Sequence, residues 1–284
     1  MNLTNKKILI VGLGMIGSSY ACKLKGKGLY VGGISARQST IDYALKRGYI
    51  DSGYASVEKE YVQQFDIVIF AVYPKLFVEW IKEHQDCFRS GAIVTDVTGV
   101  KQSIISQIKK VLRKDVEFIA SHPMAGRELS GVENCNPGVF VGANYLIVPT
   151  EENTSEAIEI SAEIGWLLEF GKISVISPEQ HDEMIAFLSQ LTHCIAVSLM
   201  CCKESEQLVD FTGDSFRDLT RIANINENMW SELFLMNKTE LLAQMKLFES
   251  QFKKLKKALE NDDVDTMKEM MRMSTQRRQY FNRK

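Results

Sequence analysis

Short apolar runs alternate with segments of helical period over the first 177 residues. Several runs are apolar at nearly every position, which is typical of strands buried on both faces. The segments between them, such as residues 40–46 and 155–170, repeat apolar residues at intervals of three and four. We expect strands at residues 7–11, 29–35, 66–72, 92–97, 117–122, 144–149 and 172–177. The alternation predicts a parallel sheet with crossover helices on both faces.

The pattern changes at Pro178, after which the apolar residues keep a helical period and no further proline occurs. We therefore predict an α/β domain over residues 1–177 and an all-helical domain over residues 178–284. A heptad stripe on one long helix comprises Leu241, Met245, Phe248, Phe252, Leu255 and Leu259. Such a stripe suits packing within a helical bundle or against a second copy of the chain, and we expect a homodimer formed through the helical domain.

Three glycines follow the first predicted strand at the spacing G-x-G-x-x-G: Gly12, Gly14 and Gly17. In a strand, turn and helix arranged in this order, they permit a tight turn, close backbone approach to a pyrophosphate and close packing of helix on strand. The amide groups of the helix N-terminus then face an anion. A glycine-rich turn without a ligand is the alternative, but the order of elements favours a bound dinucleotide.

The residues after the second strand favour NADP over NAD. In the usual fold this strand ends in a carboxylate that binds the ribose hydroxyls of NAD. Here Ser35 occupies that position and Arg37 follows, so a guanidinium and nearby hydroxyls are available for a 2′-phosphate. NAD, with Arg37 as a solvated loop residue, remains the alternative. The expected cofactor-binding residues are Gly12, Gly14, Met15, Ile16, Gly17, Ser35, Arg37, Ser39, Thr40 and Val72.

The composition is that of an ordinary globular protein, with 45% apolar and 25% charged residues among 284. A net charge of −2 gives no field that would attract nucleic acid or an anionic membrane. No apolar run approaches the ~20 residues that span a bilayer, and the N-terminus lacks a signal peptide. We expect a cytoplasmic protein whose six scattered cysteines are packing residues, with no metal site.

Two of the predicted strands end in polar residues, and ligands of such sheets bind at the carboxyl ends of the strands. Asp96 ends the fourth strand, and His122 stands at the tip of the fifth. Further along, Ser189 and His193 are four residues apart on one helix face, as are Arg217 and Arg221. Together these residues predict a pocket with one proton acceptor and cations for carboxylates.

The segment HPMAGRELSG, residues 122–131, resembles the signature of the prephenate and arogenate dehydrogenases of tyrosine biosynthesis. The resemblance extends through TDVTGVK (95–101), SPEQHDEMIAFLSQLTH (177–193) and FRDLTRIANINENMW (216–230), and so covers almost the whole chain. It implies a Rossmann-type doubly wound sheet followed by a helical dimerisation domain. The implied reaction is oxidation of prephenate with loss of carbon dioxide to give 4-hydroxyphenylpyruvate, using NAD(P); arogenate as substrate would give tyrosine.

The resemblance also implies roles for single residues. His122 matches the catalytic histidine, a general base for the substrate hydroxyl as hydride leaves the same carbon, and such help typically contributes ~10²- to 10⁴-fold. The matching substrate-binding residues are Ser189, His193, Arg221, Trp230 and Glu128. Many relatives have serine where this chain has Gly99. Thr98 is a further expected substrate-binding residue, and either its hydroxyl or the backbone could replace the missing serine. The role of His181 stays open between helix capping, a contact at the domain junction and ligand binding. That of Arg217 stays open between substrate binding and an ion pair with Asp214.

Two other classes of function are weaker alternatives. A β-hydroxyacid dehydrogenase would use a lysine of the helical domain as its acid and base, whereas the informative residues here are Ser189, His193 and Arg221. A regulator that senses NADP without turnover is disfavoured by the combination of His122 with Arg221. Feedback by tyrosine, if it occurs, would act at the active site.

Overall fold

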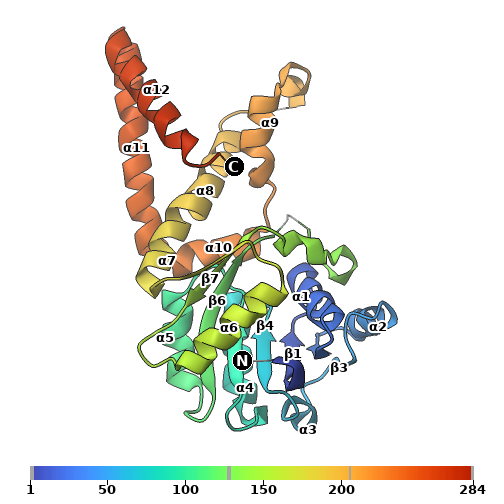
Figure 1. The fold of residues 1–284 in the computed structure, drawn as a ribbon. Coiled ribbons are helices and arrows are strands. Elements are labelled where there is room, and N and C mark those ends of the chain that lie inside the picture. Colours follow the sequence, from blue (N-terminus) through green and yellow to red (C-terminus); the bar gives the residue numbers. More distant parts are fainter. Residues whose placement is uncertain (1–2, 127–128, 205, 283–284) are drawn as a thin grey trace. The chain divides into compact units, whose positions relative to one another are not determined.

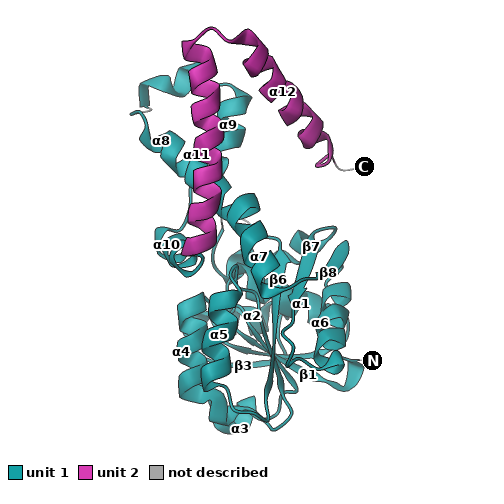
Figure 2. Cartoon of the chain, turned by 90° about the vertical axis from the view of Figure 1, so that its left-hand side faces the viewer, with its two compact units in different colours: residues 1–237 teal, residues 238–284 magenta. Residues whose placement is uncertain are grey.

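The computed structural model describes residues 3–126, 129–204 and 206–282. Glu128, one of the expected substrate contacts, lies outside the described residues. The described chain forms two compact units, residues 1–237 and residues 238–284 (Figure 2). The first unit contains the whole sheet and the helices up to residue 237, and the second contains two helices. The predicted boundary at Pro178, which rests on the change in type of secondary structure, stays a prediction.

A single eight-stranded sheet forms the centre of the first unit in the described part of the chain (Figure 1). Its strand order is β3-β2-β1-β4-β5-β6-β7-β8, the order of a doubly wound nucleotide-binding sheet extended at one edge. The strands are β1 Lys7–Val11, β2 Tyr30–Ile34, β3 Ser52–Tyr54, β4 Ile67–Phe70, β5 Ile93–Asp96, β6 Glu117–Met124, β7 Asn144–Val148 and β8 Lys172–Val175. All seven expected strands are present, and the sheet is doubly wound as predicted.

Two features of the sheet differ from the expectation. β7 pairs antiparallel with β6, with His122 opposite Leu146, although every other pairing is parallel. The apolar run 144–149 carries no information about strand direction, so the sequence could not distinguish the two. The short edge strand β3 was not expected, because Ser52–Tyr54 contains only three residues and no apolar run.

Helices cover both faces of the sheet, as the alternating pattern predicts. One face packs against α1 (Met15–Gly26), α2 (Gln38–Lys46) and α6 (Ser155–Leu167). The other face packs against α3 (Lys59–Val62), α4 (Pro74–His84) and α5 (Gln102–Val111). Each face of the sheet thus has its own hydrophobic core, and alternate residues of β1 point into one or the other. Ile8 and Ile10 belong to the first core, with α1, α2 and α6, whereas Leu9 and Val11 belong to the second. This division is the period-2 geometry of a strand buried on both sides.

A long helical stretch follows the sheet. α7 (Pro178–Ile185) begins with a capping box, in which the Ser177 hydroxyl accepts the Gln180 amide and the Gln180 side chain accepts the Ser177 amide. The helix continues through a π-helical segment, Ala186–Gln190, into α8 (Leu191–Cys201). By length and composition alone, residues Pro178–Cys201 could cross a membrane, with a mean hydropathy of 1.7. This corrects the expectation that no segment reaches that length. Polar residues near the start of the helix interrupt the apolar run, so the sequence pattern did not reveal it.

The remaining helices of the first unit are short. They are α9 (Asp214–Thr220), a 3₁₀ turn at Arg221–Ala223, and α10 (Glu227–Met236). α10 packs against α4, and its Leu233 belongs to the second core of the sheet domain. The N-terminus of α4 is capped from this helix, because the Lys75 amide donates to the Glu232 carboxylate. These contacts attach α10 to the nucleotide-binding half of the unit.

The second unit is a pair of packed helices, α11 (Lys238–Glu260) and α12 (Val264–Gln279). The heptad stripe lies on α11 as predicted. Phe252 and Leu259 of this stripe are 61% and 66% exposed, although side chains of their size are usually buried. An apolar stripe that its own unit leaves exposed is consistent with a surface that meets another protein chain.

Candidate active site

The turn after β1 has the geometry that a dinucleotide requires. Gly12 adopts φ +95°, and a Cβ there would lie 2.5 Å from the Ala71 carbonyl oxygen and from Val72 Cγ1. At Gly17 a Cβ would lie 1.8 Å from the Gly12 carbonyl oxygen, so only glycine permits this packing of α1 against the turn. Gly14, the N-cap of α1, has open space at its Cβ position. The backbone at Gly14 is therefore accessible to a ligand, and the residues present fit a nicotinamide dinucleotide.

The end of β2 presents an uncapped helix N-terminus. Arg37 is exposed and is the N-cap of α2, with no side-chain capping bond and no acidic residue in the first turn. Ser39 is exposed, while Ser35 and Thr40 are partly buried. Amide groups at such a terminus, together with a guanidinium, are suited to an anion. The assignment of this region to a 2′-phosphate stays a prediction.

His122 lies near the end of β6 and is partly exposed. Its Nδ1 is 2.9 Å from Nε2 of His181, which comes from α7 and is fully buried. Nδ1 of His181 in turn is 2.7 Å from Oδ1 of Asp182. His122 of the strand and His181 of the helix are 59 positions apart in sequence. They thus join in one chain of hydrogen bonds that ends on the buried carboxylate of Asp182.

The chain of hydrogen bonds assigns the ring protons. An ionised carboxylate only accepts, so His181 Nδ1 carries a proton and donates it to Asp182. In neutral His181 the other nitrogen, Nε2, is then an acceptor, and His122 Nδ1 must donate to it. This leaves Nε2 of neutral His122 with a lone pair, which is the form a general base requires.

Both histidines are disposed to stay neutral. Burial lowers the pKa of His122 well below its usual value, and electrostatic interactions with the neighbouring His181 ring and with the charge of Lys101 lower it further. Burial also lowers the pKa of His181, against the opposing effect of its bond to Asp182. Both rings are therefore uncharged at neutral pH, and His122 can accept a proton there.

Asp182 has a second function as the cap of α5. Its Oδ1 accepts the Lys101 amide at 2.8 Å and its Oδ2 accepts the Gln102 amide at 2.9 Å. These are N-terminal amides of α5 that have no partner within the helix. Asn237 Nδ2 donates to the Asp182 carbonyl oxygen at 2.9 Å. The residue that orients His181 is thus itself fixed by α5 and by the end of α10.

Thr98 and Gly99 lie between β5 and α5. Thr98 is buried, and its hydroxyl group contacts the Asp96 carboxylate, the Val100 carbonyl and the Lys101 ammonium. These contacts do not support a role in substrate binding, which stays a prediction. A Cβ at Gly99 would lie 3.9 Å from His122 Cε1 and 3.7 Å from Leu233, in ordinary contact. Gly99 thus lies between His122 and α10.

The remaining expected substrate residues gather around α8 and α10. Ser189 belongs to the π-helical segment, a distortion that is frequent at functional sites. His193 Nδ1 is 2.8 Å from the Ser189 carbonyl oxygen, and its ring stacks on Trp230 with 3.7 Å between centroids. Trp230 and Leu233 are one turn apart on α10, so one helix contacts both His193 and the segment beside His122. Arg221 is exposed, on a 3₁₀ turn that packs against α8.

Two residues whose roles the sequence left open have defined surroundings. Arg217 is exposed, lies 3.9 Å from Asp214 and donates to the Thr212 hydroxyl, so the suspected ion pair is present. His181 is buried against His122 and does not cap α7, since Ser177 does so. The contributions of Asp182 and Lys101 were missed, because they act through contacts across 80 residues of sequence. The adjacent pair His181 and Asp182 after a capping box was the only local signal.

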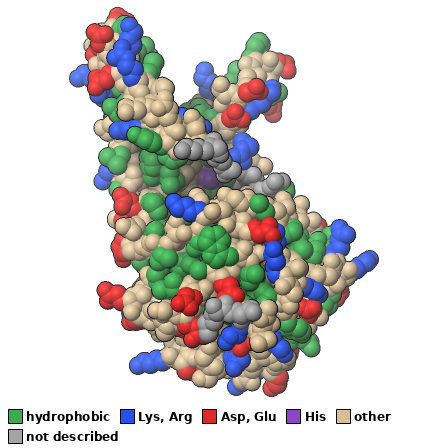
Figure 3. All heavy atoms as spheres, in the orientation of Figure 1, with side chains coloured by type: hydrophobic (Ala, Val, Ile, Leu, Met, Phe, Trp, Pro, Cys, Tyr) green, Lys and Arg blue, Asp and Glu red, His purple; other side chains and the backbone are tan. Residues whose placement is uncertain are grey.

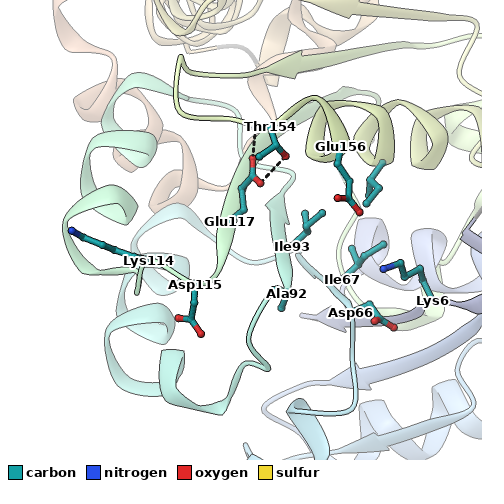
Figure 4. Close-up of a pocket in the computed structure, with 12 residues that line it drawn as sticks. Lys6, Asp66, Ile67, Ala92, Ile93, Lys114, Asp115, Glu117, Thr154 and Glu156 are labelled. Carbon is teal, nitrogen blue, oxygen red and sulfur yellow. Dashed lines mark hydrogen bonds between the residues drawn. The ribbon is translucent and has the colours of Figure 1, made fainter. Parts of the chain in front are cut away.

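A cavity of about 290 Å³ lies elsewhere, at the amino ends of β4, β5 and β6 (Figure 4). Lys6, Asp66, Lys114 and Glu156 are among its lining residues, and the Glu117 carboxylate there accepts the Thr154 amide and hydroxyl. His122 is near the carboxyl end of β6, so this cavity and the candidate site lie at opposite ends of the strands. Positive and negative side chains are interspersed over the face shown in Figure 3.

Comparisons with known proteins match both halves of the chain to one family. The family model "Prephenate dehydrogenase, nucleotide-binding domain" matches residues 20–173, and "Prephenate dehydrogenase, dimerization domain" matches residues 177–273. A prephenate dehydrogenase of Bacillus subtilis is 28% identical over 276 residues, which cover 94% of this chain and 74% of that protein. One of Lactococcus lactis is 32% identical over 254 residues, 86% of this chain and 68% of that protein.

A solved structure shares the whole fold. The prephenate dehydrogenase from A. aeolicus, in complex with hydroxyphenyl propionate and NAD+, is 27% identical, with a TM-score of 0.89 over 99% of this chain and 100% of that one. The two family models together cover residues 20–173 and 177–273, which is most of the sheet domain and most of the helical region. The chain therefore belongs to the prephenate dehydrogenase family and is an NAD(P)-dependent dehydrogenase.

Proposed function

We propose that this chain catalyses the oxidative decarboxylation of prephenate to 4-hydroxyphenylpyruvate, with His122 as the general base. The observation that carries the assignment is the hydrogen-bonded chain from His122 through His181 to Asp182, which leaves His122 Nε2 as a proton acceptor. The substrate hydroxyl donates its proton to this nitrogen. A positioned base of this kind typically contributes ~10²- to 10⁴-fold to the rate.

The glycine turn at Gly12, Gly14 and Gly17 would hold the dinucleotide, with Met15, Ile16 and Val72 beside it. When bound, the oxidised nicotinamide accepts a hydride from the hydroxyl-bearing carbon of the substrate. The carboxylate opposite that carbon then leaves as carbon dioxide, because its electrons enter a ring that becomes aromatic. His122 is the only protein group that this sequence of events requires to move a proton.

Cations and hydroxyl groups of the helical segment would bind the two carboxylates of prephenate. Arg221 supplies a guanidinium fork, which matches a carboxylate in geometry and charge. Ser189 and His193 supply hydrogen-bonding groups from one face of the helix, and the Trp230 ring holds His193 in place by stacking. Glu128 remains a candidate for the entrance to the pocket. Arogenate, which differs only in an amino group on the side chain, is the alternative substrate.

NADP is our proposed cofactor, with NAD as the alternative. The support is the exposed Arg37 at an uncapped helix N-terminus that has no acidic residue in its first turn. Loss of a charge-assisted bond to the 2′-phosphate in Arg37→Leu should raise the KM for NADP about tenfold and leave that for NAD unchanged. Arg47→Leu is the matched control, since Arg47 is at the other end of α2 and interacts with Tyr43.

A homodimer formed through the helical domain completes the proposal. The family model over residues 177–273 is a dimerization domain, and helix Pro178–Cys201 is both apolar and largely exposed within one chain. Obligate subunit interfaces are also strongly apolar, so burial of this helix against a second copy would account for its apolar surface without a bilayer. We retain a cytoplasmic location in this proposal.

The decisive experiment measures steady-state rates with prephenate and with arogenate, each with NADP and with NAD. We expect the highest kcat/KM with prephenate and NADP. A clear preference for arogenate would establish the alternative substrate, and equal kcat/KM values with the two cofactors would refute the role of Arg37. Binding of NADP without turnover of either substrate would favour a regulator over an enzyme.

A further inference from the structure

Lys101 is a fully buried lysine to which the mechanism above assigns no role. It is the N-cap of α5, and its side chain is 0% exposed. Its ammonium lies 2.6 Å from Asp96 Oδ2, and the Asp96 side chain is also 0% exposed. Taking such an ion pair out of water is costly and on balance seldom stabilises a protein more than apolar packing would. Stability alone therefore does not explain why the Lys101–Asp96 ion pair is buried.

The contacts of this pair lead toward His122 from two sides, through the backbone of β6 and through Asp182 of α7. On the strand side, Asp96 Oδ1 accepts the amide of Ser121, the residue before His122, at 3.2 Å. On the helix side, the Lys101 amide donates to Asp182 Oδ1, the same oxygen that binds His181. Lys101 thus lies between the carboxylate that orients His181 and the carboxylate that binds the backbone beside His122.

We propose that Lys101 is a positioning residue for the dehydrogenase reaction: its buried ammonium balances Asp96 and Asp182, so that the His122–His181 pair stays uncharged and His122 remains a proton acceptor. This inference rests on the proposed role of His122 as general base.

The charges around the two rings explain why a cation is needed. Asp182 from α7 and Asp96 from β5 are both acidic, and each would favour a protonated histidine nearby. Lys101 contacts both, Asp96 through its ammonium at 2.6 Å and Asp182 through its backbone amide at 2.8 Å, and its charge acts in the opposite direction. From β7 the Tyr145 hydroxyl donates to the Ser121 hydroxyl at 2.8 Å. Arg127 and Glu128 lie outside the described residues.

The pKa shifts agree with this geometry. After burial and the charge of His181, the charge of Lys101 is a further cause that lowers the pKa of His122, and it also acts to lower that of His181. Burial lowers the pKa of Lys101 itself, and the charge and hydrogen bond of Asp96 oppose that shift. Asp96 therefore helps to keep Lys101 charged, and Lys101 helps to keep the histidines neutral.

The test replaces Lys101 and measures the pKa of His122 directly. In Lys101→Met the ring nitrogens of His122 are titrated by NMR in protein labelled with ¹⁵N-histidine, and kcat/KM for prephenate is measured against pH. We expect the pKa of His122 to rise by about one unit, the lower end of the effect of a nearby charge. The acid limb of kcat/KM should move to higher pH by the same amount.

Two further variants separate this role from a structural one. Asp96→Asn combined with Lys101→Met removes the pair without leaving a buried charge unpaired, and we expect a smaller upward shift in a stably folded protein, because the negative charge of Asp96 is removed as well. Lys25→Met removes a cation from another lysine–aspartate pair, with Asp51 at 3.0 Å, and should leave the pKa of His122 unchanged.

An unchanged His122 pKa in both Lys101 variants would overturn the inference, as would a uniform loss of kcat/KM at every pH with an unmoved midpoint. The NMR titration needs no turnover, so it tests Lys101 even if prephenate proves not to be the substrate. Failure of the wild-type protein to oxidise prephenate or arogenate would count against the proposed function alone.

Discussion

His122 Nδ1 and His181 Nε2 lie 2.9 Å apart, and this contact connects the sheet domain to the first helix of the helical segment. Asp182 fixes the proton on the far side of His181, so the orientation and the tautomer of His122 are set from a different part of the chain. The proposed general base and the fold of the helical region are therefore linked.

Asp182→Asn should impair catalysis more than substrate binding. The amide can present either its oxygen or its NH₂ group to His181, so the tautomer that leaves His122 Nε2 free is no longer enforced. We expect kcat to fall at least tenfold while KM changes little, and the free energy of unfolding to fall by about 1–3 kcal/mol as the α5 cap weakens. Glu183→Gln, an exposed neighbour on α7, is the control. Unchanged kcat in Asp182→Asn would show that the His181 tautomer is not limiting.

Stability should depend on pH through His122 and His181. Their folded pKa values lie below the unfolded value of about 6.5, so below that pH the unfolded chain binds more protons. Their contribution to stability is therefore complete above pH ~6.5 and is lost as the pH falls through the folded pKa values, by up to about 1.4 kcal/mol per pH unit for each group.

Urea unfolding of the wild type between pH 7.5 and 5, with His122→Asn for comparison, measures this effect. The variant should show a smaller slope of unfolding free energy against pH than the wild type. Identical slopes would mean that His122 is not held neutral in the folded protein.

The glycine turn offers a matched pair of substitutions. Gly17→Ala places a Cβ 1.8 Å from the Gly12 carbonyl oxygen, so α1 must shift and the protein should lose at least ~2 kcal/mol of stability. Gly14→Ala meets no atom within 4 Å and should fold normally. The Gly14 variant should instead weaken NADP binding, because its methyl group occupies space beside the backbone that the pyrophosphate approaches. Thermal unfolding and fluorescence titration with NADP distinguish the two; equal stability of both variants would contradict the packing argument.

The exposed stripe of α11 makes a prediction about assembly. Phe252→Glu puts a charge in the centre of the stripe and should reduce the dimer fraction measured by light scattering. Ser250→Glu adds the same charge on the opposite side of the helix and should leave the assembly intact. A wild-type protein that is monomeric at micromolar concentration would refute the role of this stripe.

Much of the fold was predictable from local pattern. The apolar runs marked seven strands, and the glycine spacing marked the turn at Gly12, where a positive φ and close packing leave no alternative residue. The direction of β7 was not predictable, because residues 144–148 are buried whichever way the strand runs. The π-helical segment Ala186–Gln190 likewise has no distinctive sequence signal.

The candidate site was predictable only in part. His122 was identifiable from its place at a strand tip, since ligands bind at that edge of such sheets. The functions of His181 and Asp182 depend on contacts between segments far apart in sequence, and Lys101 is buried although lysines are rarely so. These are properties of tertiary structure, which local sequence does not contain.

The most direct test of the central claim compares kcat/KM for prephenate in the wild type and in His122→Asn across pH, with NADP binding measured in parallel. The account predicts an acid limb below pH 6.5 in the wild type, a loss of ~10²- to 10⁴-fold in the variant, and disappearance of the limb from its residual activity. NADP affinity should be unchanged. A variant that retains the wild-type rate and pH profile would contradict the assignment of His122 as the general base.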